Sequence, residues 1–450
     1  MNILKFAFPA QSIESALLEI IQMTDYDVLV VGAGILGLST AYHIKLANPT
    51  LKILVVDKNV AAGLGSTVNS AAAFRCFFSS TSNFALANSS VDFYKHVQND
   101  LGVDLKMKWC GYLWLFTEDE YLRLFPVLKD LEYKGFGNKE YKPEELIQTL
   151  GLRVNLADDI DAQRLGLGDT YKAIFVPKAG LIGVMSLVRF YESEFLRLGG
   201  EIRYGAEVKR LVVEPREPLG LLGEPFFWQD TRVAGAETTM GMIKAGKTVI
   251  ATGPWLSQLL DGVGIECHVK ARKRQVFFVK AETEALKKLL HTAEFSSAGS
   301  LPFTILPKPH VYIRPNLEGE GFGVAYSDEF PRTFRVEEHP KPETDFYANG
   351  LQPVVTQYLP QFKDATSSGG FAGLYEINTV DEQPVIFEDH DAIIVGGASG
   401  SGIMKADAIG RIAAAVYAGE EYATLFGESK FRVNDLGLKN RKVEVEKLII

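Results

Sequence analysis

Cysteine and histidine are scarce and scattered in this chain. Its 450 residues hold three cysteines and seven histidines, and no CxxC, HExxH or HxH spacing occurs among them. Disulfide frameworks and zinc or iron–sulfur sites need paired or clustered ligands of these types. The sequence therefore predicts no metal site, and it predicts a protein of a reducing compartment, the cytoplasm.

Long apolar runs and basic tracts are missing too. No apolar run reaches the roughly 18 residues that a membrane span needs, and the first residues lack the basic start and cleavage site of a signal peptide. The formal net charge of −9 argues against a nucleic-acid partner. Within a predicted extension, 1–23, apolar residues recur at helical spacing, which allows a docking helix or a peripheral membrane contact: Ile13, Ala16, Leu17, Ile20 and Ile21.

A glycine-rich turn between two apolar runs is the most informative local pattern. The stretch "YDVLVVGAGILGLSTAYHIKLANPTLKILVVDK" begins at Tyr26. Its composition predicts a buried strand over 26–31, a helix over 35–46 and a second strand over 52–56. This strand–turn–helix–strand context turns a common glycine spacing into a dinucleotide-binding signature.

Each residue of this signature has a predicted role. Gly32 makes the tight turn, Gly34 lets backbone N–H groups approach a pyrophosphate, and Gly37 lets the helix lie close to the strand. Asp57, at the end of the second strand, is placed to accept hydrogen bonds from both ribose hydroxyls. An acid there disfavours a cofactor with a 2′-phosphate.

The pattern along the chain predicts a mixed α/β (α+β) fold of two domains. Segments with continuous apolar runs, typical of strands in a parallel sheet, lie on both sides of a middle region, 268–335. In this middle region polar and apolar residues alternate as in an antiparallel sheet. We expect a Rossmann-like domain built from discontinuous segments, and a substrate or lid domain with an antiparallel sheet. The predicted cofactor domain comprises 24–85, 155–225, 245–258 and 370–426; the substrate domain comprises 86–154 and 259–369; 427–450 is a C-terminal extension.

Five stretches, in order over about residues 24–420, resemble the D-amino-acid oxidase/sarcosine oxidase superfamily of FAD-dependent oxidoreductases. The likeness is greatest to the branch with dimethylglycine/sarcosine dehydrogenases and dye-linked proline dehydrogenases. The stretches are the opening βαβ unit, "GLGSTVNSAAAFR" at 63–75, "GLIGVMSLVRFYESEFLRLGGEI" at 180–202, "TVIATGPW" at 248–255, and "GLYEINTVDEQPVI" with "VGGASGSGIM" near the end.

The resemblance implies FAD, with its adenosine end on the first glycine turn. It also implies that the small polar residues after Gly63 run beside the cofactor, and that a helix starting near Gly402 stabilises the anionic reduced flavin. The implied cofactor-binding residues are Gly32, Gly34, Ile35, Leu36, Gly37, Asp57, Lys58, Ser66, Thr67, Asn69, Ser70, Ala71, Val208, Thr252, Gly253, Gly400, Ser401, Gly402, Ile403 and Met404.

Departures from the family pattern carry further expectations. Asn69 and Leu374 stand where some members attach FAD covalently, so we expect non-covalent FAD. Glu376 stands where some oxidases carry an arginine for the substrate carboxylate; a glutamate repels a carboxylate and attracts an ammonium group. Substrate anchoring would then fall to Arg75 or Arg314. Met404, and not a lysine, follows "SGSGI", which disfavours a simple sarcosine oxidase. The candidate catalytic residues are Arg75, Glu376, Arg314 and Met404.

The sequence thus predicts an FAD-dependent dehydrogenase or oxidase of a C–N bond in a small amino acid or secondary amine. Two alternatives remain open: oxidation of a 2-hydroxy acid or glycerol 3-phosphate, and an FAD-bearing subunit of a hetero-oligomeric dehydrogenase. Self-association and the electron acceptor are left open as well.

Overall fold

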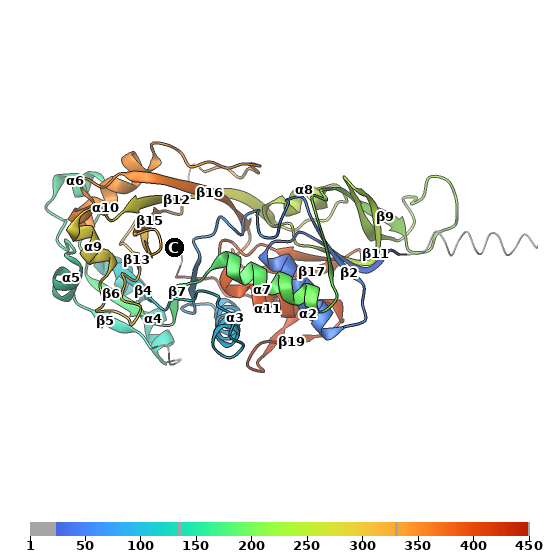
Figure 1. Cartoon of the computed structure of the whole chain (residues 1–450), viewed down its shortest axis with the longest axis horizontal. Coiled ribbons are helices and arrows are strands. Elements are labelled where there is room, and N and C mark those ends of the chain that lie inside the picture. The colour runs from blue at the N-terminus through green and yellow to red at the C-terminus, as the bar shows by residue number, and fades with distance from the viewer. Residues whose placement is uncertain (1–23, 134, 136, 329–331, 449–450) are drawn as a thin grey trace, which may run out of the picture.

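The computed structural model describes residues 24–448 except 134, 136 and 329–331. The predicted amphipathic stretch around Ile13 lies outside these residues. In the described part, two eight-stranded sheets stand at opposite ends of an elongated molecule. Figure 1 shows that blue, green and red segments, separated in the sequence, build one end of the molecule, while the teal, yellow and orange segments between them build the other. The predicted mixed α/β fold is confirmed.

The first sheet contains the opening βαβ unit. Its neighbouring strands β18, β11, β1, β2 and β8 are parallel, β17 joins them antiparallel, and β10 and β9 extend from β11. The strands are β17 (Val385–Asp389), β18 (Ala392–Gly396), β11 (Gly241–Ile250), β1 (Tyr26–Val31), β2 (Ile53–Asp57), β8 (Glu201–Tyr204), β10 (Thr231–Thr238) and β9 (Val208–Pro215). Helices α2 (Ile35–Ala47), α7 (Val184–Arg197), α11 (Ala406–Tyr417) and α3 (Thr81–Asn99) pack against one another beside it.

The second sheet is antiparallel apart from one parallel pair, β13 with β4. In spatial order its strands are β16 (Ser367–Asn378), β12 (Val269–Lys280), β15 (Gly321–Ala325), β14 (Tyr312–Asn316), β13 (Phe303–Ile305), β4 (Tyr112–Phe116), β6 (Lys172–Val176) and β5 (Lys139–Tyr141). Its helices are α4 (Glu118–Tyr133), α5 (Pro143–Leu150), α6 (Ile160–Arg164), α9 (Glu284–Leu290) and α10 (Gln352–Tyr358), the last preceded by a π-helical turn, Tyr347–Leu351.

Further short elements lie outside the two eight-stranded sheets. They are β3 (Ala73–Arg75) paired with β7 (Ala179–Leu181), β19 (Tyr422–Thr424) paired with β20 (Lys430–Arg432), α8 (Leu256–Asp261), and the 3-10 turns η1 (Gly253–Trp255), η3 (Pro360–Phe362), η4 (Ile403–Lys405) and η5 (Val433–Leu436). Of these, η1 follows β11 and η4 precedes α11, beside the first sheet where the cofactor was expected.

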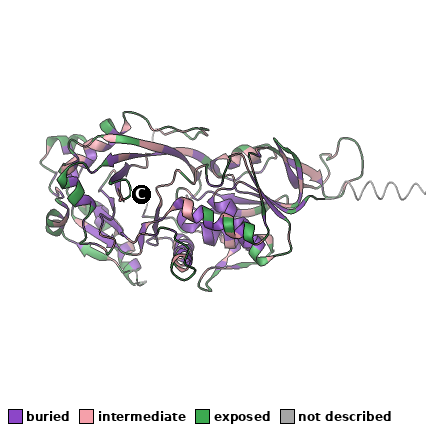
Figure 2. Cartoon of the chain, viewed as in Figure 1, coloured by how far each residue is buried: buried purple, intermediate pink, exposed green. Residues whose placement is uncertain are grey.

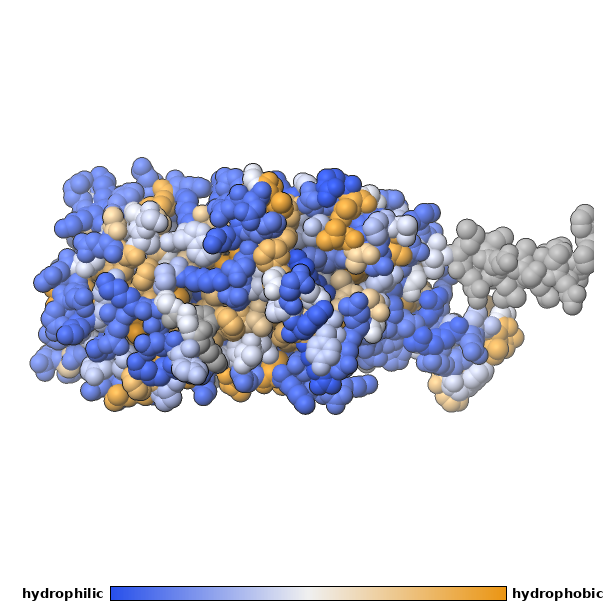
Figure 3. Space-filling model, turned by 90° about the horizontal axis from the view of Figure 1, so that it is seen from below, coloured by the Kyte–Doolittle hydropathy of each residue, from blue (hydrophilic) through white to orange (hydrophobic). Residues whose placement is uncertain are grey.

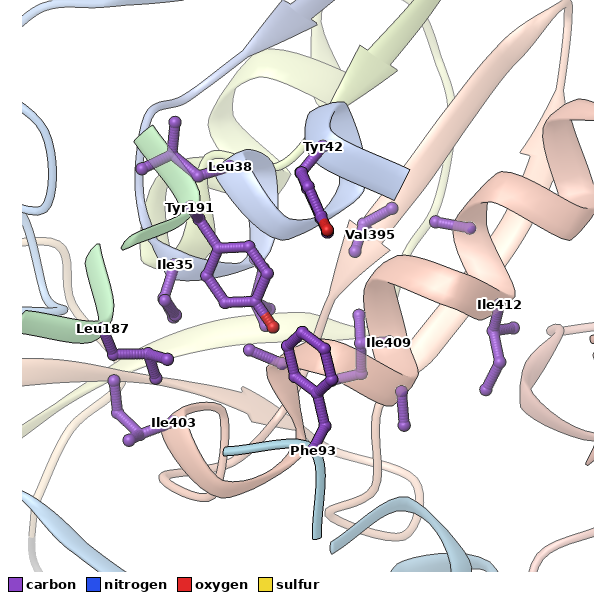
Figure 4. Close-up of a cluster of buried hydrophobic side chains, with 14 of the residues drawn as sticks. Ile35, Leu38, Tyr42, Phe93, Leu187, Tyr191, Val395, Ile403, Ile409 and Ile412 are labelled. Carbon is purple, nitrogen blue, oxygen red and sulfur yellow. The ribbon is translucent and has the colours of Figure 1, made fainter. Parts of the chain in front are cut away.

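The core beside the first sheet is apolar and rich in aromatic rings. Figure 4 shows Tyr191 from α7, Phe93 from α3 and Ile409 from α11 converging on Leu38 and Tyr42 of α2. Figure 2 shows that these helices are largely buried, with exposed positions on their outer faces. Removing such surface from water is the main favourable term in folding, so this core fixes α2 beneath the glycine turn.

Two segment assignments from the sequence need correction. β6 lies within 155–225 and most of β16 lies within 370–426, ranges assigned to the cofactor domain, but both strands belong to the second sheet. β6 pairs with β4 and β5, and β16 pairs with β12 along nearly its whole length. Such antiparallel partners come from remote sequence, so local composition did not reveal them. β10, in a range that was left unassigned, belongs to the first sheet.

The loop between β9 and β10 projects from the end of the first sheet. Leu222 and Phe227 are fully exposed, and Trp228 is largely exposed. Figure 3 shows hydrophobic groups at the tip of this projection. Among the described residues, no helix is both long enough and apolar enough to cross a bilayer.

Candidate functional site

A cavity opens where β1, β2 and β11 end, beside the first glycine turn. Its volume of about 380 Å³ is in the range of ligand pockets. Residues from seven separate parts of the chain form its wall: 31–36, 56–59, 65–70, 206–209, 251–259, 374–376 and 400–403, with Glu338 in addition. The carboxyl ends of parallel strands are the usual ligand position in such sheets, so the fold places the cavity where the sequence predicted it.

The first glycine turn is sterically restricted to glycine. Gly32 has φ +107°, and a Cβ there would lie 2.5 Å from the carbonyl oxygen of Ala251. A Cβ on Gly37 would lie only 1.9 Å from the carbonyl oxygen of Gly32. α2 therefore approaches β1 as closely as the predicted dinucleotide fold requires. Gly34 caps α2 and lines the cavity, so the positive end of the helix faces it.

Asp57 is held rigidly at the end of β2. Its Oδ2 accepts a hydrogen bond from the backbone N–H of Ala33 at 2.7 Å. Its Oδ1 accepts bonds from the backbone N–H of Asn59 at 2.8 Å and from the Asn59 side-chain amide at 3.0 Å. The carboxylate thus faces the cavity in a fixed orientation, which the expected role toward a ribose requires.

The C-terminal glycine loop closes the far side of the cavity. Gly400 has φ +85°, and a Cβ there would lie 2.2 Å from the ring of Tyr375, so this position also requires glycine. Gly400, Gly402 and Ile403 line the cavity, and η4 and α11 follow directly. The predicted helix over 405–418 is α11 with the preceding turn.

Three buried side-chain oxygens in the cavity wall have no partner within the described chain: Ser66 Oγ, Thr252 Oγ1 and Glu376 Oε2. Buried polar atoms in proteins are nearly always hydrogen-bonded. Three such atoms facing one cavity indicate a ligand rich in hydroxyl, phosphate or amide groups. A flavin dinucleotide has such groups along its length, so the residues present fit it.

Glu376 faces the cofactor cavity and lies beside glycine backbone. Its Oε1 accepts a weak hydrogen bond from the N–H of Ala398 at 3.3 Å, and its Oε2 lies 3.7 Å from the Cβ position of Gly253. Burial raises the pKa of this carboxyl to about 7, although backbone N–H groups of Ala398 and Gly397 act in the opposite direction. Near neutral pH the Glu376 carboxyl is therefore present both in its protonated form, which can donate a hydrogen bond, and as an anion.

The raised pKa of Glu376 predicts a pH-dependent stability effect. Below the unfolded-state pKa of 4.5 the carboxyl is protonated in both states and costs nothing. Between pH 4.5 and about 7 the unfolded state ionises first, so a penalty grows to at most about 3 kcal/mol. Urea unfolding of FAD-free Glu376→Gln should show little change at pH 5 and a gain of about 2 kcal/mol at pH 8.

The exposed Glu282 provides the control for this measurement. Glu282→Gln should leave the free energy of unfolding unchanged at both pH values. Equal stability of wild-type protein and Glu376→Gln at pH 8 would show that the Glu376 carboxyl ionises freely in the folded chain.

The cavity brings together most residues that the sequence singled out. Those lining it are Gly32, Gly34, Ile35, Leu36, Asp57, Lys58, Ser66, Thr67, Asn69, Ser70, Val208, Thr252, Gly253, Glu376, Gly400, Gly402 and Ile403. Gly37, Ala71, Ser401, Met404, Arg75 and Arg314 are not among its lining residues. Gly37 acts through packing, and Ser401 hydrogen-bonds Lys405.

Arg75 is buried, contrary to the simple picture of an arginine reaching into the cavity. Its guanidinium donates to the carbonyl oxygens of Phe77 and Leu448 and lies 4.0 Å from the centre of the Phe78 ring. Desolvation by burial lowers its pKa from the usual value. Lys405 is buried nearby, where desolvation lowers the pKa of its amine to about 7. Its Nζ donates to Asn83 Oδ1 and Ser401 Oγ, both at 2.6 Å.

Arg314 and Met404 also have packing roles. Arg314, on β14, donates a hydrogen bond to the carbonyl oxygen of Ala71, and burial lowers its pKa. It thereby ties the second sheet to the segment that borders the cavity. Met404 lies within η4, is buried in the core and does not line the cavity; its expected role near the flavin stays a prediction.

Several cavity residues were not predicted as cofactor contacts. Trp255 ends the stretch "TVIATGPW" and lies in η1. Lys58 Nζ lies 4.1 Å from the centre of the Trp255 ring, and the Trp255 indole N–H donates to Glu338 at 2.8 Å. No local pattern in the sequence marks Glu338. The other unpredicted lining residues are Val31, Val56, Asn59, Gly65, Ala206, Glu207, Lys209, Ala251, Pro254, Gln258, Leu259, Leu374 and Tyr375.

Comparison with known proteins places this geometry among flavoenzymes. The family model "FAD dependent oxidoreductase" matches residues 27–416. FAD-dependent oxidoreductase domain-containing protein 1 of Bos taurus is 24% identical over 411 residues, 86% of this chain and 80% of that protein. Glycine oxidase of Pseudomonas putida is 25% identical over 360 residues, 77% of this chain and 81% of that protein.

Solved structures show the same fold at lower identity. L-proline dehydrogenase from P. horikoshii superposes with a TM-score of 0.70 at 21% identity, covering 92% of this chain and 97% of that one. Glycine oxidase from Geobacillus kaustophilus also gives 0.70, at 17% identity, covering 93% and 99%.

Proposed function

Because the chain belongs to the family of FAD-dependent oxidoreductases, we propose that it oxidises a C–N bond of a small amino acid or secondary amine. The family match confirms FAD as the predicted cofactor and confirms that the chain is an enzyme. Substrate class, site residues and the mode of FAD attachment belong to the proposal. The names of similar proteins, glycine oxidase and L-proline dehydrogenase, support an amino-acid substrate.

One observation carries the proposal: the cavity with three unpartnered oxygens borders buried arginine and tyrosine side chains of the second sheet. The shared element is β16, whose residues 374–376 line the cavity. The centre of the Tyr375 ring lies 5.5 Å from the guanidinium carbon of Arg274. Burial raises the pKa of the Tyr375 hydroxyl. A substrate bearing both an amine and a carboxylate suits such a junction of cofactor cavity and buried cations.

The proposal assigns parts of FAD to parts of the wall. Asp57 and the first glycine turn would hold the adenosine and pyrophosphate, while Asn69, Leu374 and Gly400 would border the flavin. When bound, FAD supplies the acceptor for a hydride from the carbon next to nitrogen. Neither Asn69 nor Leu374 has a side chain that forms a covalent flavin bond, which supports non-covalent FAD.

The chain's own residues would bind and orient the substrate. Arg75 offers a buried positive charge for a carboxylate, beside the buried amine of Lys405, and a charge-assisted hydrogen bond in a dry site is stronger than one in water. No histidine lines the cavity, so the wall presents no imidazole base for an alcohol proton. A neutral amine needs no such base, which favours amine over alcohol oxidation.

Anaerobic mixing of the FAD-loaded protein with four compounds tests the proposal. Proline or sarcosine should bleach the flavin, whereas glycerol 3-phosphate and 2-hydroxyglutarate should not. Bleaching by the hydroxy compounds alone would favour the alcohol-oxidising alternative. Turnover by the isolated chain with an artificial acceptor would exclude dependence on a partner subunit, and its absence despite bleaching would support that dependence.

The pH profile of flavin reduction gives a further expected result. Only a neutral amine releases a hydride, so below the substrate's amine pKa the reduction rate should rise about tenfold per pH unit at subsaturating substrate. Stopped-flow absorbance measures this rate directly. A flat profile between pH 6 and about 9 would contradict amine oxidation.

A further inference from the structure

The C-terminal tail, residues 442–448, folds back from the first sheet into the space beside the second (Figure 1). Its exposure alternates: Val445 and Lys447 are exposed, while Glu446 and Leu448 are buried. Burial of Glu446 and Leu448, each beside an exposed residue, indicates a specific docking site and not a surface tail held by chance.

Glu446 is the polar anchor of this tail. Its carboxylate accepts hydrogen bonds from the backbone N–H and the hydroxyl of Ser79, at 2.9 and 2.7 Å, and from the backbone N–H of Ser80 at 3.2 Å. Despite burial, the nearby Arg75 holds the pKa of this carboxyl below its usual range. Glu446 therefore supplies a buried negative charge beside the buried guanidinium of Arg75 and the buried amine of Lys405.

Leu448 is the apolar anchor. It is almost fully buried in a cluster with Tyr112 and Trp114 of β4 and Tyr312 of β14. Its carbonyl oxygen accepts a hydrogen bond from Arg75 Nη2 at 2.6 Å. The tail thus occupies the guanidinium that the proposed function assigns to the substrate carboxylate.

We propose that residues 444–448 are a plug on the substrate site, with the Leu448 carbonyl holding Arg75 until a carboxylate-bearing ligand displaces it. This inference rests on the proposed function, since it takes Arg75 as the substrate's anchor. The substrate carboxylate and the Leu448 carbonyl then compete for the same guanidinium, so the tail leaves when the substrate binds.

The balance of interactions allows this exchange. A neutral carbonyl makes a weaker bond to a guanidinium than a carboxylate, which binds with charge assistance and often through two parallel bonds. While the tail is docked, the negative charge of Glu446 balances the buried positive charge of Arg75. The same negative charge repels an entering carboxylate. The tail must therefore move when an anionic ligand binds.

Titration of the oxidised holoenzyme with sodium acetate tests the plug without turnover, through the perturbation of the flavin absorption spectrum. Leu448→Ala removes the apolar anchor and keeps all charges, so it should lower the Kd for acetate about fivefold to tenfold. Glu446→Gln should lower it as well, but loss of its charge alone would have that effect. Leu448→Ala is therefore the decisive variant, and Val445→Ala, on the exposed side of the tail, is its control and should leave the Kd unchanged.

Tryptic cleavage after Lys442 and Lys447 gives a second readout. Saturating acetate should speed release of the tail from the wild-type holoenzyme, as followed by intact mass. An unchanged or weakened acetate affinity in Leu448→Ala, with no acetate effect on cleavage, would show that the tail is a fixed wall and would overturn the plug. If acetate does not perturb the flavin of any variant and no amine bleaches the flavin, both the plug and the proposed function are wrong. If acetate has no effect but amines bleach the flavin normally, only the plug is wrong.

Discussion

Gly37→Ala is expected to yield a protein that purifies without FAD. The added Cβ would lie 1.9 Å from the carbonyl oxygen of Gly32, a contact that no real side chain tolerates. α2 would have to move off β1, and the N–H groups at its start would no longer meet the pyrophosphate. We expect FAD affinity to fall by a factor of 100 or more, equivalent to about 3 kcal/mol, as measured by fluorescence titration of the apoprotein.

Two other glycine substitutions separate cofactor loss from misfolding. Gly350→Ala has no neighbour within 4 Å of its new Cβ and should bind FAD normally. A Cβ on Gly34 would touch only Thr67 Oγ1, at 3.4 Å, so Gly34→Ala should fold and yet weaken FAD binding, because it crowds the cavity. Normal FAD affinity in Gly37→Ala would contradict the assignment of the first glycine turn.

Arg75→Lys is expected to impair amino-acid oxidation strongly while keeping the flavin spectrum. Lysine keeps the buried charge but loses the planar fork that binds a carboxylate through two bonds. Truncating one partner of a buried charge pair costs about 2–5 kcal/mol, so kcat/KM should fall on the order of 30-fold to 1000-fold. Steady-state kinetics should show the loss mainly in KM, and the Kd for acetate should rise in parallel.

A matched arginine and a second substrate make this result specific. Arg411 pairs with Asp407 at 2.7 Å on α11 and does not line the cavity, so Arg411→Lys should retain kcat/KM. Pyrrolidine, an amine without a carboxylate, should reduce the flavin of Arg75→Lys and wild-type protein at similar rates. An equal loss with both substrates would assign Arg75 a structural role only.

The cofactor half of the site could be predicted from the sequence because its constraints are local. Gly32, Gly37 and Asp57 act within one βαβ unit of about thirty residues, where spacing alone fixes the geometry. The same holds for Gly400, whose turn and following helix are adjacent in sequence. A steric or dihedral requirement within a short segment therefore appears directly as a residue pattern in the sequence.

The substrate half depends on contacts between remote segments, which spacing does not encode. Glu338 reaches Trp255 and Lys58 from a loop of the second domain, and Leu448 reaches Arg75 across the whole chain. Arg75 was singled out from the sequence as a candidate anchor, yet its burial and its carbonyl partners follow from the fold. For the same reason β6 and β16 were assigned to the cofactor domain, since their partner strands come from elsewhere.

The flavin content of the purified, FAD-supplemented protein tests the central claim most directly. The account predicts an absorption band near about 450 nm that belongs to FAD. After acid precipitation, all of the yellow colour should appear in the supernatant, because the proposal has FAD bound without a covalent bond to any side chain. A colourless protein after supplementation, or a flavin that stays with the precipitate, would contradict an FAD held non-covalently between the two glycine turns.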